Sequence, residues 1–395
     1  MSEEELRKEA VRRRLEGESP TEIADALGRS TRWVRKWVAR HFEDGHDNSW
    51  AQGRSRAPHR SPTQTPQRLA DLIVTARRSL VENPRAQYGA LAVQWELHRL
   101  GVTDIPPART IERVLQRAGM SRPRRARRNS YVPKGVPYPH PVDVVAGSTH
   151  QIDMIGPRHL AGGVGFHVLN MVDVGSHQAG SDILDAARPV LVAEGLAGIW
   201  ARTGVPDVAQ FDNHSNFRGG IPPAWAHFGP VVATCLDLGV TPRFIPLREP
   251  WRNGTIEHFN DTWDKASFRT EIFTGIDHLR AENDTFIEFH NEHHRYSIHS
   301  GATPNQIWQN RPRNLLPERY TAPTKLPAQG RIEVIRFIRS NRRVELFGKR
   351  VTVAENQTHQ YVTAIIKVRA RKLIVVTLNG EIIHHSDFNL NRQLR

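Results

Sequence analysis

The chain has 395 residues, with 55 Lys and Arg against 41 Asp and Glu, 9 Trp and a single Cys. That length predicts roughly two to four domains, and the composition is that of a soluble globular protein, not of a disordered or membrane-spanning one. The lone Cys235 excludes a disulfide framework and any multi-thiolate zinc site, and the N-terminus lacks a signal-peptide pattern, so we expect a cytoplasmic protein.

Charge is distributed unevenly along the chain. Residues 1–150 carry 27 basic and 17 acidic residues, residues 151–325 carry 15 and 19, and residues 326–395 carry 13 and 5. Basic arms favour a polyanionic partner such as DNA or RNA, because each neutralised phosphate releases counterions. The mildly acidic centre between them is typical of a site where carboxylates hold divalent metal.

The first 46 residues predict three short helices, over 6–15, 21–27 and 31–41. This spacing is typical of a helix-turn-helix domain, in which the third helix would be the recognition helix. A three-helix bundle with a solvated basic face is the alternative. The candidate DNA contacts on the third helix are Arg32, Arg35, Lys36 and Arg40.

A linker rich in Ser, Pro, Gln and Arg follows over 47–66, and helices at 67–82, 88–100 and 108–117 predict a second DNA-binding bundle within 67–120. The next linker, 121–147, holds five Arg within seven residues and could follow a phosphate backbone or a groove. The candidate contacts there are Arg124, Arg125, Arg127 and Arg128.

From 148 to 312 the pattern predicts an α/β layer fold, and 313–395 predicts a linker and a small basic all-β barrel of five or six short strands. The fold class is therefore multidomain, with all-α units first, a central α/β core and an all-β end. In the core the expected strands are 151–155, 164–174, 178–184, 208–211 and 241–245, and the expected helices are 188–203, 225–238 and 252–268.

Three acidic residues occupy informative places in the core. Asp153 lies inside the first strand, Asp212 ends a later strand, and Glu257 lies one turn into a helix that follows Asn253-Gly254. An unpaired carboxylate among strand hydrophobics would cost several kcal/mol, so we expect it at a strand end or on a cation. Strand ends and a helix N-terminus can converge, and two Mg²⁺ ions would offset the repulsion among three carboxylates.

The residues around these acids carry a family resemblance. His150–Asp153, Phe211–Asn213 and the Asn-Gly-x-x-Glu-x-x-Asn pattern within Pro250–Asn260 closely resemble the catalytic core of DDE transposases of bacterial insertion sequences, a core similar to that of retroviral integrases. The resemblance covers about residues 148–312, and Gly301–Trp308 looks like the end of that core.

The resemblance implies an RNase H-like integrase catalytic core in which Asp153, Asp212 and Glu257 are catalytic and hold two Mg²⁺ ions, with Mn²⁺ as a substitute. It implies an enzyme that cuts transposon ends and joins their 3′-hydroxyls to target DNA. The implied partners are double-stranded DNA and further copies of the chain, in the bacterial cytoplasm at the nucleoid; a helper ATPase stays open. Asn213, Asn253 and His258 are candidates to support the triad, although helix capping explains Asn253 equally well.

Two departures from the family pattern stand out. The usual Asp-Asn-Gly is replaced by Asp212-Asn213-His214-Ser215, which could reshape the loop. There are also 44 residues between Asp212 and Glu257, more than in compact versions of this core, and 218–223 resembles an inserted loop.

Several rival interpretations remain. Asp173 on the neighbouring strand is a competing carboxylate, with a structural role as the better interpretation. A histidine cluster could imitate a zinc site, although a solvent-facing or DNA-facing helix is favoured in the absence of Cys partners. The main rival function is a non-catalytic, domesticated or regulatory DNA-binding protein, whereas RNA binding lacks the expected aromatic platforms. The cluster consists of His290, His293, His294 and His299.

Overall fold

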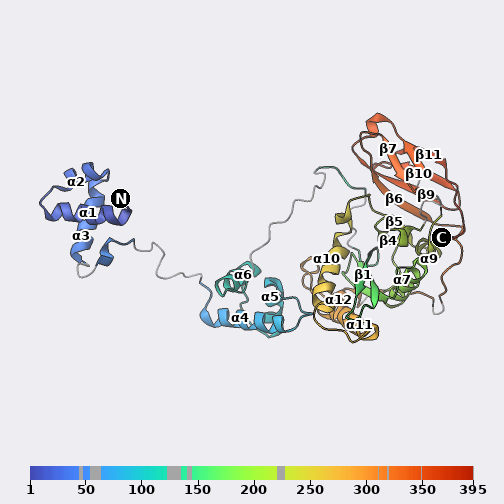
Figure 1. The fold of residues 1–395 in the computed structure, drawn as a ribbon, viewed down its shortest axis with the longest axis horizontal. Helices are drawn as coiled ribbons and strands as arrows, with labels where there is room; N and C mark the ends of the chain where they lie inside the picture. Colours follow the sequence, from blue (N-terminus) through green and yellow to red (C-terminus); the bar gives the residue numbers. More distant parts are fainter. Residues whose placement is uncertain are drawn as a thin grey trace. The chain divides into compact units, whose positions relative to one another are not determined.

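The computed structural model divides into two compact units, residues 1–65 and 66–395, which are described separately (Figure 1). None of the helices in the described part of the chain combines the length and hydrophobicity that a bilayer span requires. The residues described are 1–43, 48–53, 64–121, 135–139, 145–219, 227–309, 311–317, 320–347 and 349–394.

The first unit consists of three helices and a short 3₁₀ turn. They are α1 (Glu3–Leu15), α2 (Pro20–Leu27), α3 (Thr31–Glu43) and η1 (Asn48–Ala51). Their small core is formed by Ala10, Ile23, Ala24 and Val34. Gly28, at the end of α2, has φ +62°, the left-handed conformation that lets the chain turn into α3.

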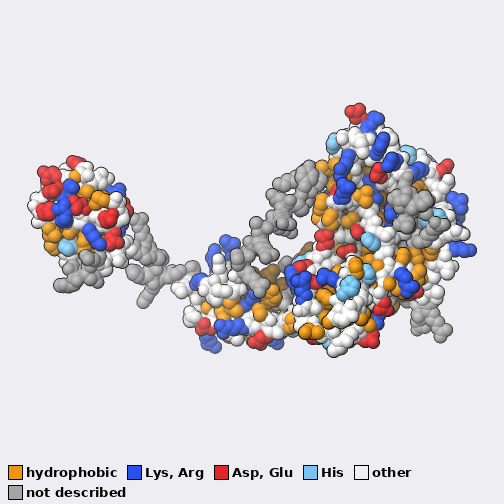
Figure 2. Space-filling view, viewed as in Figure 1, with side chains coloured by type: hydrophobic (Ala, Val, Ile, Leu, Met, Phe, Trp, Pro, Cys, Tyr) orange, Lys and Arg blue, Asp and Glu red, His pale blue; other side chains and the backbone are white. Residues whose placement is uncertain are grey.

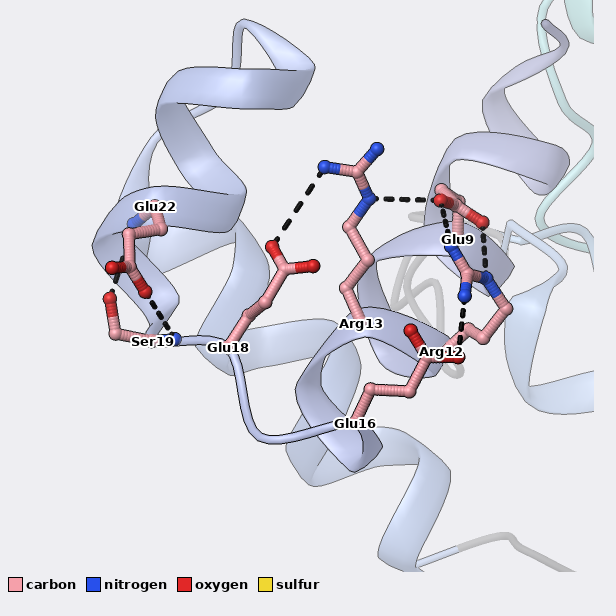
Figure 3. Close-up of polar contacts among 7 residues, drawn as sticks. All are labelled: Glu9, Arg12, Arg13, Glu16, Glu18, Ser19 and Glu22. Atoms are coloured by element: carbon pink, nitrogen blue, oxygen red, sulfur yellow. Dashed lines mark hydrogen bonds and ion pairs between the residues drawn. The ribbon is translucent and has the colours of Figure 1, made fainter.

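Local sequence explains where these helices begin. Ser19 and Glu22 form a capping box at the start of α2, with reciprocal hydrogen bonds of 3.3 and 2.9 Å between side chain and backbone (Figure 3). On α1, Glu9 bonds to Arg12 and to Arg13, so neighbouring turns of the helix carry opposite charges (Figure 3).

The second unit begins with another helical bundle, α4 (Gln67–Glu82), α5 (Ala90–Arg99) and α6 (Ala108–Arg117). Apolar residues from all three helices, including Ile73, Val93 and Ile111, form its core. The segment after α4 contacts the helix α11 (Ile276–His293) through an ion pair between Arg85 and the buried Glu282.

A nine-stranded mixed sheet organises the rest of this unit, in the order β11-β10-β9-β6-β5-β4-β1-β2-β3. Strands β1, β4, β5 and β6 run parallel, and the other neighbours are antiparallel. The strands of this sheet are β1 (Thr149–His159), β2 (Gly165–Asp173), β3 (Ala179–Leu184), β4 (Val208–Phe211), β5 (Thr241–Phe244), β6 (Arg331–Phe337), β9 (Tyr361–Lys367), β10 (Lys372–Val376) and β11 (Ile382–Asp387).

Helices cover both faces of the sheet, as alternation along β2 requires. Leu169 and Met171 pack toward α7 and α9, whereas Val168 and Val172 pack toward α10 and α11. The remaining elements are α7 (Pro189–Thr203), α8 (Ser215–Arg218), α9 (Pro230–Asp237), η2 (Pro250–Asn253), α10 (Gly254–Trp263), the π-helical turn η3 (Asp264–Phe268), η4 (Ser297–His299), α12 (Pro304–Trp308) and η5 (Glu355–Gln357).

The predicted separate C-terminal barrel is not confirmed. Six strands are present after residue 330, but β6 pairs with β5, and β9, β10 and β11 extend the same sheet. Of the strands described there, only β7 (Arg343–Leu346) and β8 (Lys349–Thr352) pair apart from this sheet. The physical reason is that β5 would otherwise end the sheet with unpaired backbone groups, which β6 satisfies, aided by the ion pair between Arg243 and Glu333.

Candidate active site

Asp153 lies on β1, and Asp212 directly follows the neighbouring parallel strand β4. Strand β1 pairs with β4 so that Gln151 is opposite Gln210, and each aspartate follows two residues later. Both side chains are half-buried. Burial, reinforced by the negative charges of Asp212 and Glu257, raises the pKa of Asp153 to about 6. Asp153 is therefore close enough to Asp212 and Glu257 to respond to their charges.

Glu257 is carried by the first turn of α10, and two glutamines fix the beginning of this helix. The side-chain oxygen of Gln151 accepts hydrogen bonds from the backbone N–H groups of Thr255 and Ile256, at 3.1 and 3.2 Å. The side-chain amides of Gln151 and Gln210 both donate to the carbonyl oxygen of Arg252, at 3.3 and 3.0 Å. The strands that carry the aspartates thus also hold the helix that carries the exposed Glu257.

Asn260 connects α10 directly to Asp153. Its Nδ2 donates to Oδ2 of Asp153 at 2.8 Å, and its Oδ1 accepts from Nδ2 of Asn170 at 2.9 Å. Asn170 is the residue opposite Asp153 in the β1–β2 pairing. Asn260 is not among the predicted site residues, although it ends the Asn-Gly-x-x-Glu-x-x-Asn pattern, which could have indicated it.

The loop after β4 has no need of the glycine that the family pattern usually places there. His214 has φ −62° and ψ +143°, an ordinary extended conformation, and its ring caps the short helix α8. Its backbone N–H donates to Oδ1 of Asp212 at 2.9 Å. Within the described residues the Asp-Asn-His-Ser departure therefore forms a regular turn, while most of the expected inserted loop at 218–223 lies outside them.

Asn213 and Asn253 both support this edge of the sheet. Asn213 donates to the carbonyl oxygen of Ile245 at 2.7 Å and accepts from Arg336 at 2.9 Å. Asn253 is buried and makes no capping hydrogen bond to α10; its Oδ1 accepts from Gln210 at 2.9 Å. His258, by contrast, is exposed.

The competing carboxylate lies away from the triad. In the β1–β2 pairing Asp173 is opposite His150, three residues along the strand from Asn170, which is opposite Asp153. Asp173 accepts hydrogen bonds from the backbone N–H groups of Gly147 and Gly175 and from the hydroxyl of Ser176. These bonds hold the turn after β2, a structural role.

The four histidines do not form one cluster. His290 and His294 are buried with ring centroids 4.5 Å apart, whereas His293 is exposed and His299 bonds to His177. Burial lowers the pKa of His290 and of His294.

No three His, Cys, Asp or Glu side chains of the described residues are arranged as a set that could hold a metal ion. The chemistry of Asp153, Asp212 and Glu257 nevertheless fits one: all three offer carboxylate oxygens, the ligands that Mg²⁺ prefers. None of them forms an ion pair with a described Lys or Arg, and the pKa of Asp153 is raised first by burial and then by the charges of Asp212 and Glu257. A divalent cation would offset that excess negative charge.

Of the candidate DNA contacts on α3, Arg32, Arg35 and Lys36 are exposed. Arg40 is different, because it is buried and its guanidinium lies 4.9 Å from the ring centroid of Trp37. The other candidates lie outside the described residues, namely Arg124, Arg125, Arg127 and Arg128. A DNA-binding role for α4–α6 stays a prediction.

Comparison with known families gives two matches. Residues 1–49 match the model of a homeodomain-like domain, and residues 238–304 match that of the integrase core domain. These matches confirm the resemblance to the DDE transposases and integrases, a class of polynucleotidyl transferases that act on DNA. The integrase match includes Glu257 but neither aspartate.

Among solved structures, the catalytic core domain of HTLV-2 integrase in complex with magnesium is 12% identical, with 41% of this chain and 97% of that chain covered and a TM-score of 0.30. The catalytic core domain of BIV integrase is 16% identical, with 41% and 94% covered and a TM-score of 0.31. No curated protein matches the chain.

Proposed function

We propose that this protein is a DNA transposase that cuts the ends of a mobile DNA element and joins the freed 3′-hydroxyls to target DNA. The observation that carries the proposal is that Asp153 on β1 and Asp212 directly after the parallel strand β4 each follow the paired glutamines by two residues, with Glu257 on a helix that Gln151 anchors to the same sheet. The integrase core match supports this reaction class.

Asp153, Asp212 and Glu257 are the residues that would hold Mg²⁺, for which Mn²⁺ could substitute, with two ions in each site. When bound, such ions activate an attacking oxygen and stabilise the leaving oxygen of an in-line phosphoryl transfer. The chain's own contribution is to place the three carboxylates: Asn260 orients Asp153. This mechanism requires no Ser or Tyr nucleophile.

Recognition of the element ends is proposed for the homeodomain-like unit, through the exposed Arg32, Arg35 and Lys36 of α3. Because two ends must be processed together, we propose that the chain acts as a homo-oligomer on double-stranded DNA. Mass photometry on paired-end DNA tests this, and a strictly monomeric complex would contradict it.

The decisive experiment measures end cleavage and strand transfer on the element's own ends, in Mg²⁺ or Mn²⁺, for wild type and for Glu257→Gln. We expect metal-dependent nicking by wild type and its loss in the variant, because one ligand oxygen is replaced by an amide. Asp261→Asn is the matched control, since it removes one exposed carboxylate from the same helix.

An unchanged melting temperature of the second unit would show that Glu257→Gln is folded, and fluorescence anisotropy would show that it still binds DNA. If wild type binds verified ends but never cuts them, the catalytic proposal fails. That outcome would favour a regulatory DNA-binding protein. Equal nicking by wild type and Glu257→Gln would remove Glu257 from the site.

A further inference from the structure

A polar pocket of about 280 Å³ lies where the parallel strands β5 and β6 end. One wall is the segment 246–249, which follows β5, and the other is the end of β6 together with the turn that leads to β7. Four of its lining residues are arginines, namely Arg248, Arg336, Arg339 and Arg343. We refer to this site as the arginine pocket.

The arginine pocket opens at the same edge of the sheet as Asp212. Strands β4, β5 and β6 run parallel, so their C-terminal ends lie at one edge. Arg336 makes the connection direct: it lines the pocket and donates hydrogen bonds to Asn213, the neighbour of Asp212, and to the carbonyl oxygen of Ile245.

The charge of the pocket is not neutralised by its own acids. Glu249 bonds to Arg252 at 3.2 Å and accepts from the hydroxyl of Tyr361 at 2.8 Å. Glu345 forms an ion pair with Arg350 at 3.3 Å. Both carboxylates therefore have partners outside the group of four arginines.

Three of the four arginines are exposed, Arg248, Arg339 and Arg343, and none of the ion pairs found among the described residues involves them. The fourth, Arg336, is buried and bonds to carbonyl and amide oxygens. Guanidinium groups offer paired N–H donors that match phosphate oxygens, so these three exposed groups around a small pocket have the chemistry that suits an anion.

Lys and Arg side chains also gather on the visible face of the C-terminal strands (Figure 2). The backbone of Arg248 has φ +64°, a conformation that costs a non-glycine residue about 1 kcal/mol or more. The segment is thus held in a turn that places this side chain at the rim of the pocket.

We propose that the arginine pocket binds a backbone phosphate of the DNA strand that passes the Asp153, Asp212 and Glu257 site. The proposal rests on the proposed function for the identity of its ligand, DNA. Its role is to hold the strand in register with the carboxylates: Arg339 and Arg343 contact the phosphate, while Arg336 links the pocket to the loop of Asp212.

The test compares the full chain with the double variant Arg339→Gln/Arg343→Gln. The matched control is Lys367→Gln/Arg369→Gln, which removes two exposed positive charges at and just after the C-terminal end of β9. In the β6–β9 register Lys367 lies opposite Arg331 at the start of β6, whereas the pocket lies at the end of β6. Fluorescence anisotropy measures the Kd for a short duplex over a series of salt concentrations. The slope of log Kd against log salt should fall by about 0.9 for each phosphate that the variant no longer neutralises.

We expect this reduced slope in the pocket variant and a wild-type slope in the control. Equal slopes in the pocket variant and the control would overturn the proposal. Binding is measured without cleavage, so the two proposals fail separately. A wild type that never cuts DNA, with the slope still reduced in the pocket variant, leaves the pocket standing and removes the catalytic function.

A cross-link gives a second readout that does not depend on charge. The native Cys235 is fully buried, so Ser340→Cys, between two pocket residues, would supply an accessible thiol. DNA with a thiol-reactive group on a backbone phosphate should cross-link there and not in the control Ala370→Cys. Absence of a cross-link at residue 340, or equal cross-linking at both positions, would overturn the proposal.

Discussion

The guanidinium of Arg336 donates a hydrogen bond of 2.9 Å from Nη2 to Oδ1 of Asn213. This bond joins β6, in the C-terminal part of the chain, to the loop that carries Asp212. The same guanidinium bonds to the carbonyl oxygens of Ile245 and Glu345, at 3.1 and 2.9 Å. The geometry of the Asp212 loop therefore depends on a residue 123 positions further along the chain.

Arg336→Met should destabilise the second unit and slow DNA cutting. The change removes the donor to the amide oxygen of Asn213 and to the carbonyl oxygen of Glu345, at a cost of about 1–3 kcal/mol for each group left unsatisfied, whereas the carbonyl of Ile245 keeps the hydrogen bond from Asn213. Thermal melting and the nicking rate measure the two effects. Arg331→Met, an exposed residue on the same strand, is the control and should change stability by about 0.5 kcal/mol or less.

Asn260→Ala should reduce the nicking rate by about 10- to 100-fold, because Asp153 loses the donor that orients it. Asn260→Asp should reduce the nicking rate further, since the new carboxylate would add a fourth negative charge to the site of Asp153, Asp212 and Glu257. DNA binding and melting temperature should stay close to wild type, as they should in the control Asp261→Ala. Nicking at the wild-type rate by Asn260→Ala would exclude a positioning role.

Arg35 and Arg40 of α3 should respond differently to replacement by alanine. Arg35 is exposed, so Arg35→Ala should weaken binding to the element end without changing the melting temperature of the first unit. Arg40 packs on Trp37, so Arg40→Ala should destabilise the unit by about 0.5–2 kcal/mol. Each variant is the control for the other, measured by anisotropy and thermal melting.

The second unit should lose stability as the pH falls. Burial lowers the pKa of His150 to about 3, and its Nδ1 accepts a hydrogen bond of 3.2 Å from Trp200. Below the ordinary histidine pKa of about 6.5 the unfolded chain therefore binds a proton that the folded chain does not. Stability falls by up to about 1.4 kcal/mol per pH unit from this group, while Asp153, whose pKa is raised to about 6, acts in the opposite direction.

His150→Gln should flatten the dependence of melting temperature on pH between about 7 and 4, because the variant lacks the buried imidazole whose pKa is lowered in the folded chain. His159→Gln, at an exposed position of the same strand, is the control. The readout is the slope of melting temperature against pH, so a uniform loss of stability in the variant does not affect the test. A slope in His150→Gln equal to that of the control would show that His150 is not responsible.

Much of the local structure follows from the sequence alone. Apolar periodicity predicts the helices of the first unit within a few residues, because it acts over one turn, and the capping box that the structure shows at Ser19 and Glu22 is equally local. The alternating core strands are predicted for the same reason. The motif around Glu257 predicts the resemblance to an integrase core that the match over residues 238–304 confirms.

Tertiary structure decided what depends on distant partners. Sequence patterns predict that strands exist after residue 330, but not that β6 would pair with β5, because pairing partners are chosen by the whole sheet. Arg40 looks like a surface residue until Trp37 covers it. The links from Asn260 to Asp153 and from Arg336 to Asn213 span 107 and 123 positions, and only the folded sheet brings such residues within hydrogen-bonding distance.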